Sequence, residues 1–277
     1  MTTTAVYALG LTYAEHASET GLARHAAVVF RKHCQALRDP GEFVLPTSAE
    51  VSARLRQLDP ALAAWLDARA CTLPVLLDYE VELGMRLLAD CRLEDLADPE
   101  HALPLAYFVA NDLTARGLQM CGHKAQDPLP YWSAAKSMPG MLPIGADECL
   151  GTSRAWPEVE LVTRVNGEVR QRASTVHLLY SPGEILERVL RQAHEQRLYR
   201  DDLILTGTPA GVAWTTSPWQ QRLERLLPRR PGIALALRRA VHNRRFLQAG
   251  DVLEFSGAEL GQVTLRITAA TQETAHD

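Results

Sequence analysis

The stretch Leu77-Asp78-Tyr79-Glu80-Val81-Glu82-Leu83 is the segment around which the rest of the chain is organised. Read as a β-strand, it places Asp78, Glu80 and Glu82 on one face, because successive side chains of a strand point to opposite sides. Neighbouring carboxylates there stand about 6.7 Å apart and repel each other by roughly 2 to 3 kcal/mol at an effective dielectric of about 20. A fold tolerates this repulsion most easily beside a cation, and carboxylate oxygens suit Mg2+, Mn2+ or Ca2+. The alternative is the solvated acidic face of an edge strand.

Length and composition bound the class of protein. The 277 residues are 47% hydrophobic and 22% charged, as in a soluble globular protein, and we expect one domain over 1–277. A net charge of -4 gives no bias towards nucleic acid. The five cysteines are scattered and lack a C-x-x-C pair, which indicates reduced thiols. No apolar run is long enough for a membrane span and the start lacks a basic segment, so we expect a cytoplasmic protein without a membrane partner.

A histidine and a glutamate near the start have the spacing of a catalytic pair. A helix beginning at Thr12 would place His16 and Glu19 on one face, three residues apart. A carboxylate that binds one imidazole nitrogen raises the basicity of the other, as a general base requires. The alternative is a surface helix on which both side chains face water.

A further acidic position follows the apolar run 102–110, which reads as a strand ending in Asn111-Asp112. Functional groups collect at such strand ends. A helix over 113–120 would align Asp112, Arg116 and Gln119 on one face, as an anion-receiving surface beside a further metal ligand. The alternative is a weak salt bridge between Asp112 and Arg116 on a solvated helix.

Weaker signals come from three other segments. Lys136 lies in a Pro- and Gly-rich loop, where a lone lysine is usually a solvated charge. The turn 207–211 could bring Thr208 or backbone N–H groups to an anionic ligand, although it lacks the lysine of a nucleotide-binding loop. Asn166-Gly167 predicts a β-hairpin over 158–175.

The sharpest change in composition is the segment 222–245, which holds eight arginines. Their charges either face water or form a basic lid, or a surface for a partner or nucleic acid.

Taken together, seven motifs resemble the fumarylacetoacetate hydrolase family. They follow the family's order at roughly its spacing and span most of residues 7–267: GLTYAEHASE (10–19), DYEVEL (78–83), NDLTARGLQ (111–119), Lys136 with PIG (143–145), VNGEVRQ (165–171), TGTPAGV (206–212) and AGDV (249–252). The chain departs from the family's pattern at Thr12, where Asn is common, and in enlarged segments at 20–70 and 213–248.

The resemblance implies an α+β fold, a mainly-β mixed roll of curved sheets like the C-terminal domain of fumarylacetoacetate hydrolase, with peripheral helices. Residues 1–72 would form an N-terminal lid and scaffold region, and 73–277 the metal-binding β core with an Arg-rich insertion near 213–248. The resemblance also implies a homodimer.

The resemblance further implies roles for individual residues. A divalent ion, Mg2+ or Mn2+ with Ca2+ as a further candidate, would be held by Glu80, Glu82 and Asp112. The catalytic residues would be His16, Glu19 and Lys136. The residues that contact the carboxylate and oxo groups of a small oxo-acid substrate would be Arg116, Gln119 and Thr208.

These roles lead to the hypothesis of a metal-dependent hydrolase that cleaves a carbon–carbon bond in a 2,4-dioxo acid of the acylpyruvate or fumarylacetoacetate type. His16 would activate water, Lys136 with Gln119 would stabilise the oxyanion, and the metal would act as a Lewis acid and template. The alternative is decarboxylation, isomerisation or hydration of a 2-oxo diacid through the same enolate. A scaffold without activity that binds an acidic partner through the arginines is a third hypothesis.

Overall fold

The computed structural model of the chain describes residues 4–10, 12, 13, 27–98, 102–215 and 226–270. Its larger sheet has eight strands and is mixed, because β1 (Val6–Gly10) runs parallel to β13 (Leu203–Leu205) and antiparallel to β2 (Val28–Lys32). The main path through this sheet runs β2 (Val28–Lys32), β1 (Val6–Gly10), β13 (Leu203–Leu205), β6 (Val81–Leu87), β7 (Pro104–Asn111), β9 (Pro143–Ile144) and β3 (Leu37–Arg38), and β10 (Cys149–Thr152) also pairs with β7.

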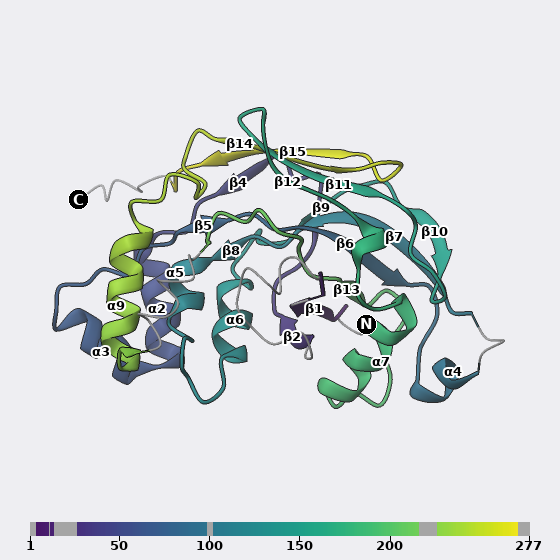
Figure 1. The fold of residues 1–277 in the computed structure, drawn as a ribbon, viewed down its shortest axis with the longest axis horizontal. Coiled ribbons are helices and arrows are strands. Elements are labelled where there is room, and N and C mark those ends of the chain that lie inside the picture. Colours follow the sequence, from purple (N-terminus) through teal and green to yellow (C-terminus); the bar gives the residue numbers. More distant parts are fainter. Residues whose placement is uncertain (1–3, 11, 14–26, 99–101, 216–225, 271–277) are drawn as a thin grey trace, which may run out of the picture.

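A second sheet of five strands lies across the top of the molecule in Figure 1. Its order is β12 (Glu168–Ser174), β11 (Glu160–Val165), β14 (Val252–Gly257), β15 (Gln262–Thr268) and β4 (Glu42–Val44). The predicted hairpin is confirmed: β11 and β12 are antiparallel, and Asn166 and Gly167 both have positive φ, as a tight hairpin turn requires. A short antiparallel pair, β5 (Leu77–Asp78) with β8 (Thr114–Ala115), completes the β structure of the described residues.

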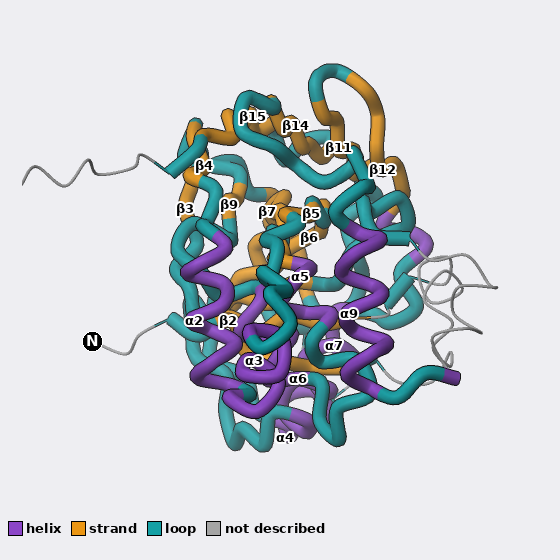
Figure 2. Tube along the Cα trace, turned by 90° about the vertical axis from the view of Figure 1, so that its left-hand side faces the viewer, coloured by secondary structure: helices purple, strands orange, loops and turns teal. Residues whose placement is uncertain are grey.

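Helices lie on two sides of the curved sheets. One group comprises α2 (Ser48–Leu58), α3 (Pro60–Asp67), α5 (Arg116–Met120), α6 (Leu129–Ala135) and α9 (Arg229–Ala240). Figure 2 views the molecule from the side on which α2, α3 and α9 stand. The helices α7 (Pro182–Gln192) and α4 (Leu93–Ala97) lie at the opposite end in Figure 1. Capping boxes begin α2 and α7, through Thr47 with Glu50 and Ser181 with Glu184, as the sequence predicts.

Strand β6 lies inside the larger sheet, antiparallel to β13 on one side and to β7 on the other. It packs closely at Gly84, where an added Cβ atom would stand 2.2 Å from the ring of Phe108 on β7. The main core joins side chains of both sheets and the helices, including the fully buried Leu83, Phe255 and Leu62. Burial of each such side chain stabilises the fold by about 1.5 to 3 kcal/mol.

Two local predictions are wrong. The expected continuous strand over 77–83 is interrupted at Tyr79 and Glu80, between β5 and β6, and β6 is not an edge strand with a solvated acidic face. The expected helix over 113–120 begins only at Arg116, because Thr114 and Ala115 pair with β5. In both places long-range strand pairing prevails over local periodicity.

The predicted α+β class, with curved mixed sheets and peripheral helices, is confirmed. Every helix in the described part of the chain is too short or too polar to cross a lipid bilayer.

Candidate active site

Three acidic side chains meet where β6 begins and β7 ends. Glu80 and Glu82 flank Val81, the first residue of β6, which pairs with Asn111 at the end of β7. The Asp112 N–H donates to the Glu80 carbonyl at 2.8 Å, so the two chain segments stay together just beyond the sheet. One carboxylate oxygen from each of Glu80, Glu82 and Asp112 lies within 4.8 Å of the other two, and all three residues are buried. We call these three residues the acidic cluster.

Two buried lysines bind the acidic cluster. The Lys136 ammonium lies 2.6 Å from Glu80 Oε2 and 2.6 Å from Asp112 Oδ2. Lys32, at the end of β2, binds the other Asp112 oxygen, Oδ1, and donates to the Met141 carbonyl at 3.2 Å. Lys136, a predicted site residue, therefore contacts the cluster directly, whereas Lys32 is a residue that the sequence analysis missed.

Asp78 is not a member of the cluster. Its carboxylate accepts hydrogen bonds from Arg116 Nε at 2.7 Å and from the backbone N–H groups of Ala213 and Trp214 at 2.7 and 3.1 Å. The break between β5 and β6 leaves Asp78 outside the acidic cluster, although its carboxylate and that of Glu80 bind the same guanidinium group, that of Arg116.

Arg116 links Asp78 to the acidic cluster. Its guanidinium also donates to Glu80 Oε1 and to the side-chain oxygen of Gln119. The predicted alignment of Asp112 with Arg116 and Gln119 on one helix face is wrong, since Asp112 precedes β8. Burial alone would lower the pKa of Arg116, but the charges of Glu80 and Asp78 outweigh burial and raise it. Arg116 is therefore a permanent cation beside the cluster.

The segment that follows β13 also contacts the acidic cluster, through Gly207. The Gly207 N–H donates to Glu82 Oε2 at 2.7 Å. Gly207 has φ +90, and an added Cβ atom would stand 2.4 Å from the Thr12 hydroxyl oxygen, so both conformation and space favour glycine. Thr208, the next residue, donates its hydroxyl proton to the Val81 carbonyl at 3.1 Å. In this structure Thr208 therefore supports the start of β6, the strand that carries Glu82.

His16, the predicted general base, and Glu19, the residue predicted to orient it, lie outside the described residues. Their roles, and the substrate contacts predicted for Arg116, Gln119 and Thr208, stay predictions. Among the predicted site residues that the structure describes, Lys136 and Arg116 contact the acidic cluster directly.

Burial strongly affects the ionisation of Glu82. Burial is the main cause that raises its pKa well above the ordinary value, and the nearby Asp112 charge raises it further, against the opposing effect of Lys136. Burial lowers the pKa of Lys136, but the charges of Asp112 and Glu80 outweigh it and raise that pKa. Lys136 is therefore an ammonium group, and an added positive charge near Glu82 would favour the ionised form of that carboxylate.

The cluster fits a divalent cation. Its donors are three carboxylates, the hard oxygen ligands that Mg2+, Mn2+ and Ca2+ prefer. The ligand oxygens lie within 4.8 Å of one another, so a single ion could contact all three residues. The raised pKa of Glu82 is consistent with this fit, because a bound cation favours the ionised carboxylate.

The Arg-rich insertion packs against the helices. Arg229 donates to Asp59 Oδ2 at 3.1 Å, to the Cys121 carbonyl at 2.8 Å and to the Tyr131 hydroxyl at 2.7 Å. Arg245 donates to the Gly211 carbonyl at 2.9 Å. The alternative in which the arginines face water is therefore wrong for these two residues, which hold the insertion to the body of the protein.

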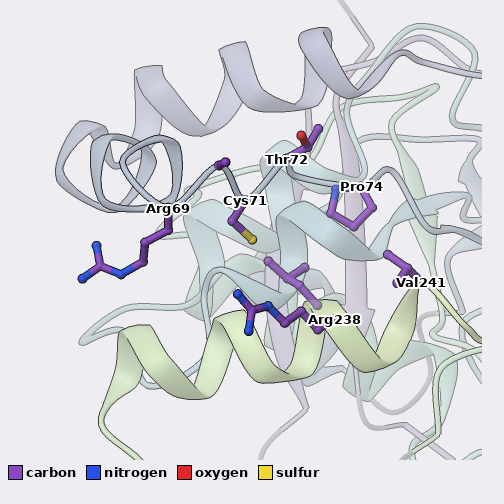
Figure 3. A pocket seen from close by; sticks show the side chains of 8 residues that line it. Arg69, Cys71, Thr72, Pro74, Arg238 and Val241 are labelled. Atoms are coloured by element: carbon purple, nitrogen blue, oxygen red, sulfur yellow. The ribbon is translucent and has the colours of Figure 1, made fainter.

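A cavity of about 300 Å3 lies apart from the acidic cluster, between the segment 69–74 and α9 (Figure 3). Its lining includes Arg69, Cys71 and Arg238. Figure 3 shows the Cys71 thiol directed towards α9. Because none of the three acidic residues lines this cavity, the chemistry of the cluster does not take place there.

Comparisons with known proteins give a family match and similar folds. The family model described as fumarylacetoacetate (FAA) hydrolase C-terminal matches residues 5–268. An uncharacterized protein of Methanocaldococcus jannaschii is 28% identical over 209 residues, which are 76% of this chain and 73% of that protein.

Two solved structures are similar in fold. One is a fumarylpyruvate hydrolase from Pseudomonas aeruginosa in complex with Mn2+ and pyruvate, with a TM-score of 0.60, 21% identity, and coverage of 96% of this chain and 90% of that chain. The other is a 5-carboxymethyl-2-hydroxymuconate delta-isomerase from Mycobacterium smegmatis, with a TM-score of 0.59, 24% identity, and coverage of 97% and 80%.

Proposed function

Because the chain belongs to the fumarylacetoacetate hydrolase family, we propose that it is a divalent-metal-dependent enzyme that hydrolyses a carbon–carbon bond in a 2,4-dioxo acid of the acylpyruvate or fumarylacetoacetate type. The observation that carries the proposal is the convergence of three buried carboxylates beside the Lys136 ammonium. The similar fumarylpyruvate hydrolase, which was solved with Mn2+ and pyruvate, supports both the metal and the substrate class.

Glu80, Glu82 and Asp112 would hold the ion, which we expect to be Mg2+ or Mn2+. When bound, it would supply Lewis-acid polarisation and balance negative charge that develops on the substrate. Lys136 contacts two of these carboxylates and is an ammonium group, so it would donate hydrogen bonds to an oxyanion that forms beside them.

The proposed reaction consumes one water molecule. His16, oriented by Glu19, would take a proton from water while the water oxygen bonds to the 4-oxo carbon. The bond between carbons 3 and 4 then breaks, its electron pair stays on carbon 3 as an enolate, and protonation of that carbon gives pyruvate for an acylpyruvate substrate. The other product is the carboxylic acid of the acyl group.

Arg116, Gln119 and Thr208 would bind the carboxylate and oxo groups of the substrate. Arg116 and Gln119 are bonded to each other in this structure, so contact with a substrate carboxylate would require that bond to open. A guanidinium group is suited to this exchange, because it presents several N–H donors to a carboxylate at once.

The second candidate is isomerisation of a 2-oxo diacid, which the similar fold of the delta-isomerase favours. Decarboxylation and hydration rest on the same enolate chemistry. We also propose a homodimer, which sedimentation of the purified chain tests directly. The cytoplasmic location and the absence of a nucleic-acid partner stay predictions.

The deciding experiment is a screen of small 2-oxo and 2,4-dioxo acids against Mg2+, Mn2+ and Ca2+, with product analysis. Hydrolysis releases pyruvate and a carboxylic acid, decarboxylation releases carbon dioxide, and isomerisation gives a product of unchanged mass. Activity should disappear on chelation, and it should fall sharply in His16→Ala and Lys136→Met. Full activity of Glu80→Gln without added metal would overturn the proposal.

A further inference from the structure

A buried glutamine on the second sheet contacts Val81, the residue between Glu80 and Glu82. Gln171 lies on β12, is 1% exposed, and reaches across to Val81 at the start of β6. Its side-chain oxygen accepts the Val81 N–H at 3.0 Å and the Thr163 hydroxyl at 3.0 Å. Its side-chain nitrogen donates to the Thr208 hydroxyl oxygen at 2.9 Å and to the Pro209 carbonyl at 3.1 Å. Both ends of the amide are therefore bound.

Val81 needs these partners because its neighbouring strand stops short. The pairing of β13 with β6 ends at Leu205 and Gly84, and Thr206 then binds the Leu83 carbonyl. Beyond that point, Gln171 accepts the Val81 N–H and Thr208 donates to the Val81 carbonyl. These two side chains replace a strand on that side of Val81, so its peptide groups are not left unpaired in the core.

The backbone of β12 places Gln171 for this contact. Thr163 pairs with Gln171 and Arg164 with Val169, so Arg170 is an additional residue on β12. Such a β-bulge redirects the side chain beside it. Gly211 leaves room for the bulge, because an added Cβ atom there would stand 2.4 Å from the Arg170 carbonyl oxygen.

We propose that Gln171 is a positioning residue for the metal centre: with Thr208 it fixes the two peptide groups of Val81, and thereby the directions of Glu80 and Glu82. Val81 joins these two residues, so a rotation of either of its peptide groups would move one carboxylate relative to the other. This inference rests on the proposed function, because it concerns the same ion site. The loss of such a supporting contact typically weakens metal binding by about 10- to 100-fold.

The test compares two variants of the full chain. Gln171→Met keeps the length of the side chain and removes all four hydrogen bonds. Thr163→Val is the matched control, because it removes one buried hydrogen bond to the same amide and leaves the contacts with Val81 and Thr208 in place. Mn2+ affinity is measured from the spin-resonance signal of free Mn2+, and thermal unfolding is measured in excess chelator.

We expect both variants to unfold at a lower temperature than the wild type, and only Gln171→Met to lose Mn2+ affinity, by about tenfold or more. The inference is overturned if folded Gln171→Met binds Mn2+ within about twofold of the wild type, or if Thr163→Val loses as much affinity. If the wild type itself binds no divalent ion, the proposed metal centre is wrong, which is a separate outcome.

A second variant covers the case in which Gln171→Met does not fold. Thr208→Val removes the hydroxyl that donates to the Val81 carbonyl and keeps the shape of the side chain. Metal affinity is measured without substrate, so a substrate contact of Thr208 does not affect it. An affinity about fivefold weaker or more supports the inference. Unchanged affinity, or failure of both variants to fold, contradicts it.

Discussion

Lys32 and Lys136 bind opposite oxygens of a single carboxylate, that of Asp112. The two lysines come from distant parts of the chain, the end of β2 and the residue after α6, and their side chains are 0% and 3% exposed. A carboxylate held from both sides by ammonium groups has little freedom to rotate. Asp112 is therefore oriented by the protein itself, towards Glu80 and Glu82.

Substitution of Lys32 should destabilise the protein strongly. Lys32→Met leaves one oxygen of Asp112 without its cation in a buried site, and we expect a loss of about 3 to 5 kcal/mol in the free energy of unfolding. The control is Lys124→Met at an exposed lysine, for which we expect a loss below about 1 kcal/mol. Denaturant unfolding in the presence of a chelator measures both. Equal losses in the two variants would show that the Lys32 contact contributes nothing.

Substitutions of Asp78 and Glu80 should differ in their effect on metal affinity. Asp78→Asn weakens the contacts with Arg116 and the backbone N–H groups of Ala213 and Trp214, so we expect a loss of stability of about 3 kcal/mol. Mn2+ affinity should stay close to that of the wild type. Glu80→Gln removes a ligand oxygen and should abolish most of the affinity. Calorimetric titration with Mn2+ distinguishes the two, and an equal loss of affinity would place Asp78 in the metal centre after all.

The contribution of Glu82 to the stability of the metal-free protein should fall as the pH rises above 4.5, the ordinary pKa of a glutamate. The pKa of Glu82 is raised in the folded protein, mainly by burial, so the folded state holds this proton more tightly than the unfolded chain. The stability that Glu82 contributes is therefore present below pH 4.5 and is lost as the pH rises through the raised pKa.

A divalent ion reverses this effect, because it binds the ionised carboxylate. The rise in Tm on addition of Mg2+ or Mn2+ should thus grow with pH over the same range. Glu82→Gln should remove the part of the pH dependence that comes from this group in the metal-free protein. Thermal unfolding between pH 4.5 and neutral pH, with and without the ion, tests both statements. A shift in Tm that shrinks with rising pH would be the opposite result.

Arg229 should contribute to the stability of the fold, and its neighbour Arg230 should not. Arg229→Gln loses the contacts with Asp59, Tyr131 and the Cys121 carbonyl, and we expect a loss of about 2 kcal/mol in unfolding free energy. The adjacent exposed Arg230 is the matched control, and Arg230→Gln should change stability by less than about 0.5 kcal/mol. If Arg229→Gln were as mild as the control, the contacts of Arg229 would contribute nothing to holding the insertion.

The sequence predicts the parts of the fold whose signals are local. The hairpin at Asn166-Gly167 and the capping boxes of α2 and α7 depend on a few adjacent residues, and the structure confirms them. The break at Tyr79 and Glu80 depends instead on β5 pairing with β8, a contact between residues about 37 positions apart, which periodicity does not reveal.

The residues of the candidate site also differ in whether the sequence reveals them. Acidic residues in an apolar context already point to a cation, but the pattern alone includes Asp78, and only the family resemblance selects Glu80, Glu82 and Asp112 as the ligands. The local sequence around Lys32 does not single it out, because a lysine after an apolar strand usually faces water. One signal was available: the chain contains only three lysines among its 29 basic residues, and two of them bind the acidic cluster. In a chain whose basic residues are nearly all arginines, a lysine indicates a position that needs a compact ammonium group instead of a planar guanidinium group.

The cations around the acidic cluster also bear on the order of events in a newly made chain. Lys32, Lys136 and Arg116 compensate much of the buried negative charge by themselves. We therefore expect the polypeptide to reach its folded shape before any ion arrives, with loading as a later and reversible step. The identity of the ion would then follow from which one the surroundings supply, so preparations from different growth media would carry different metals on the same scaffold.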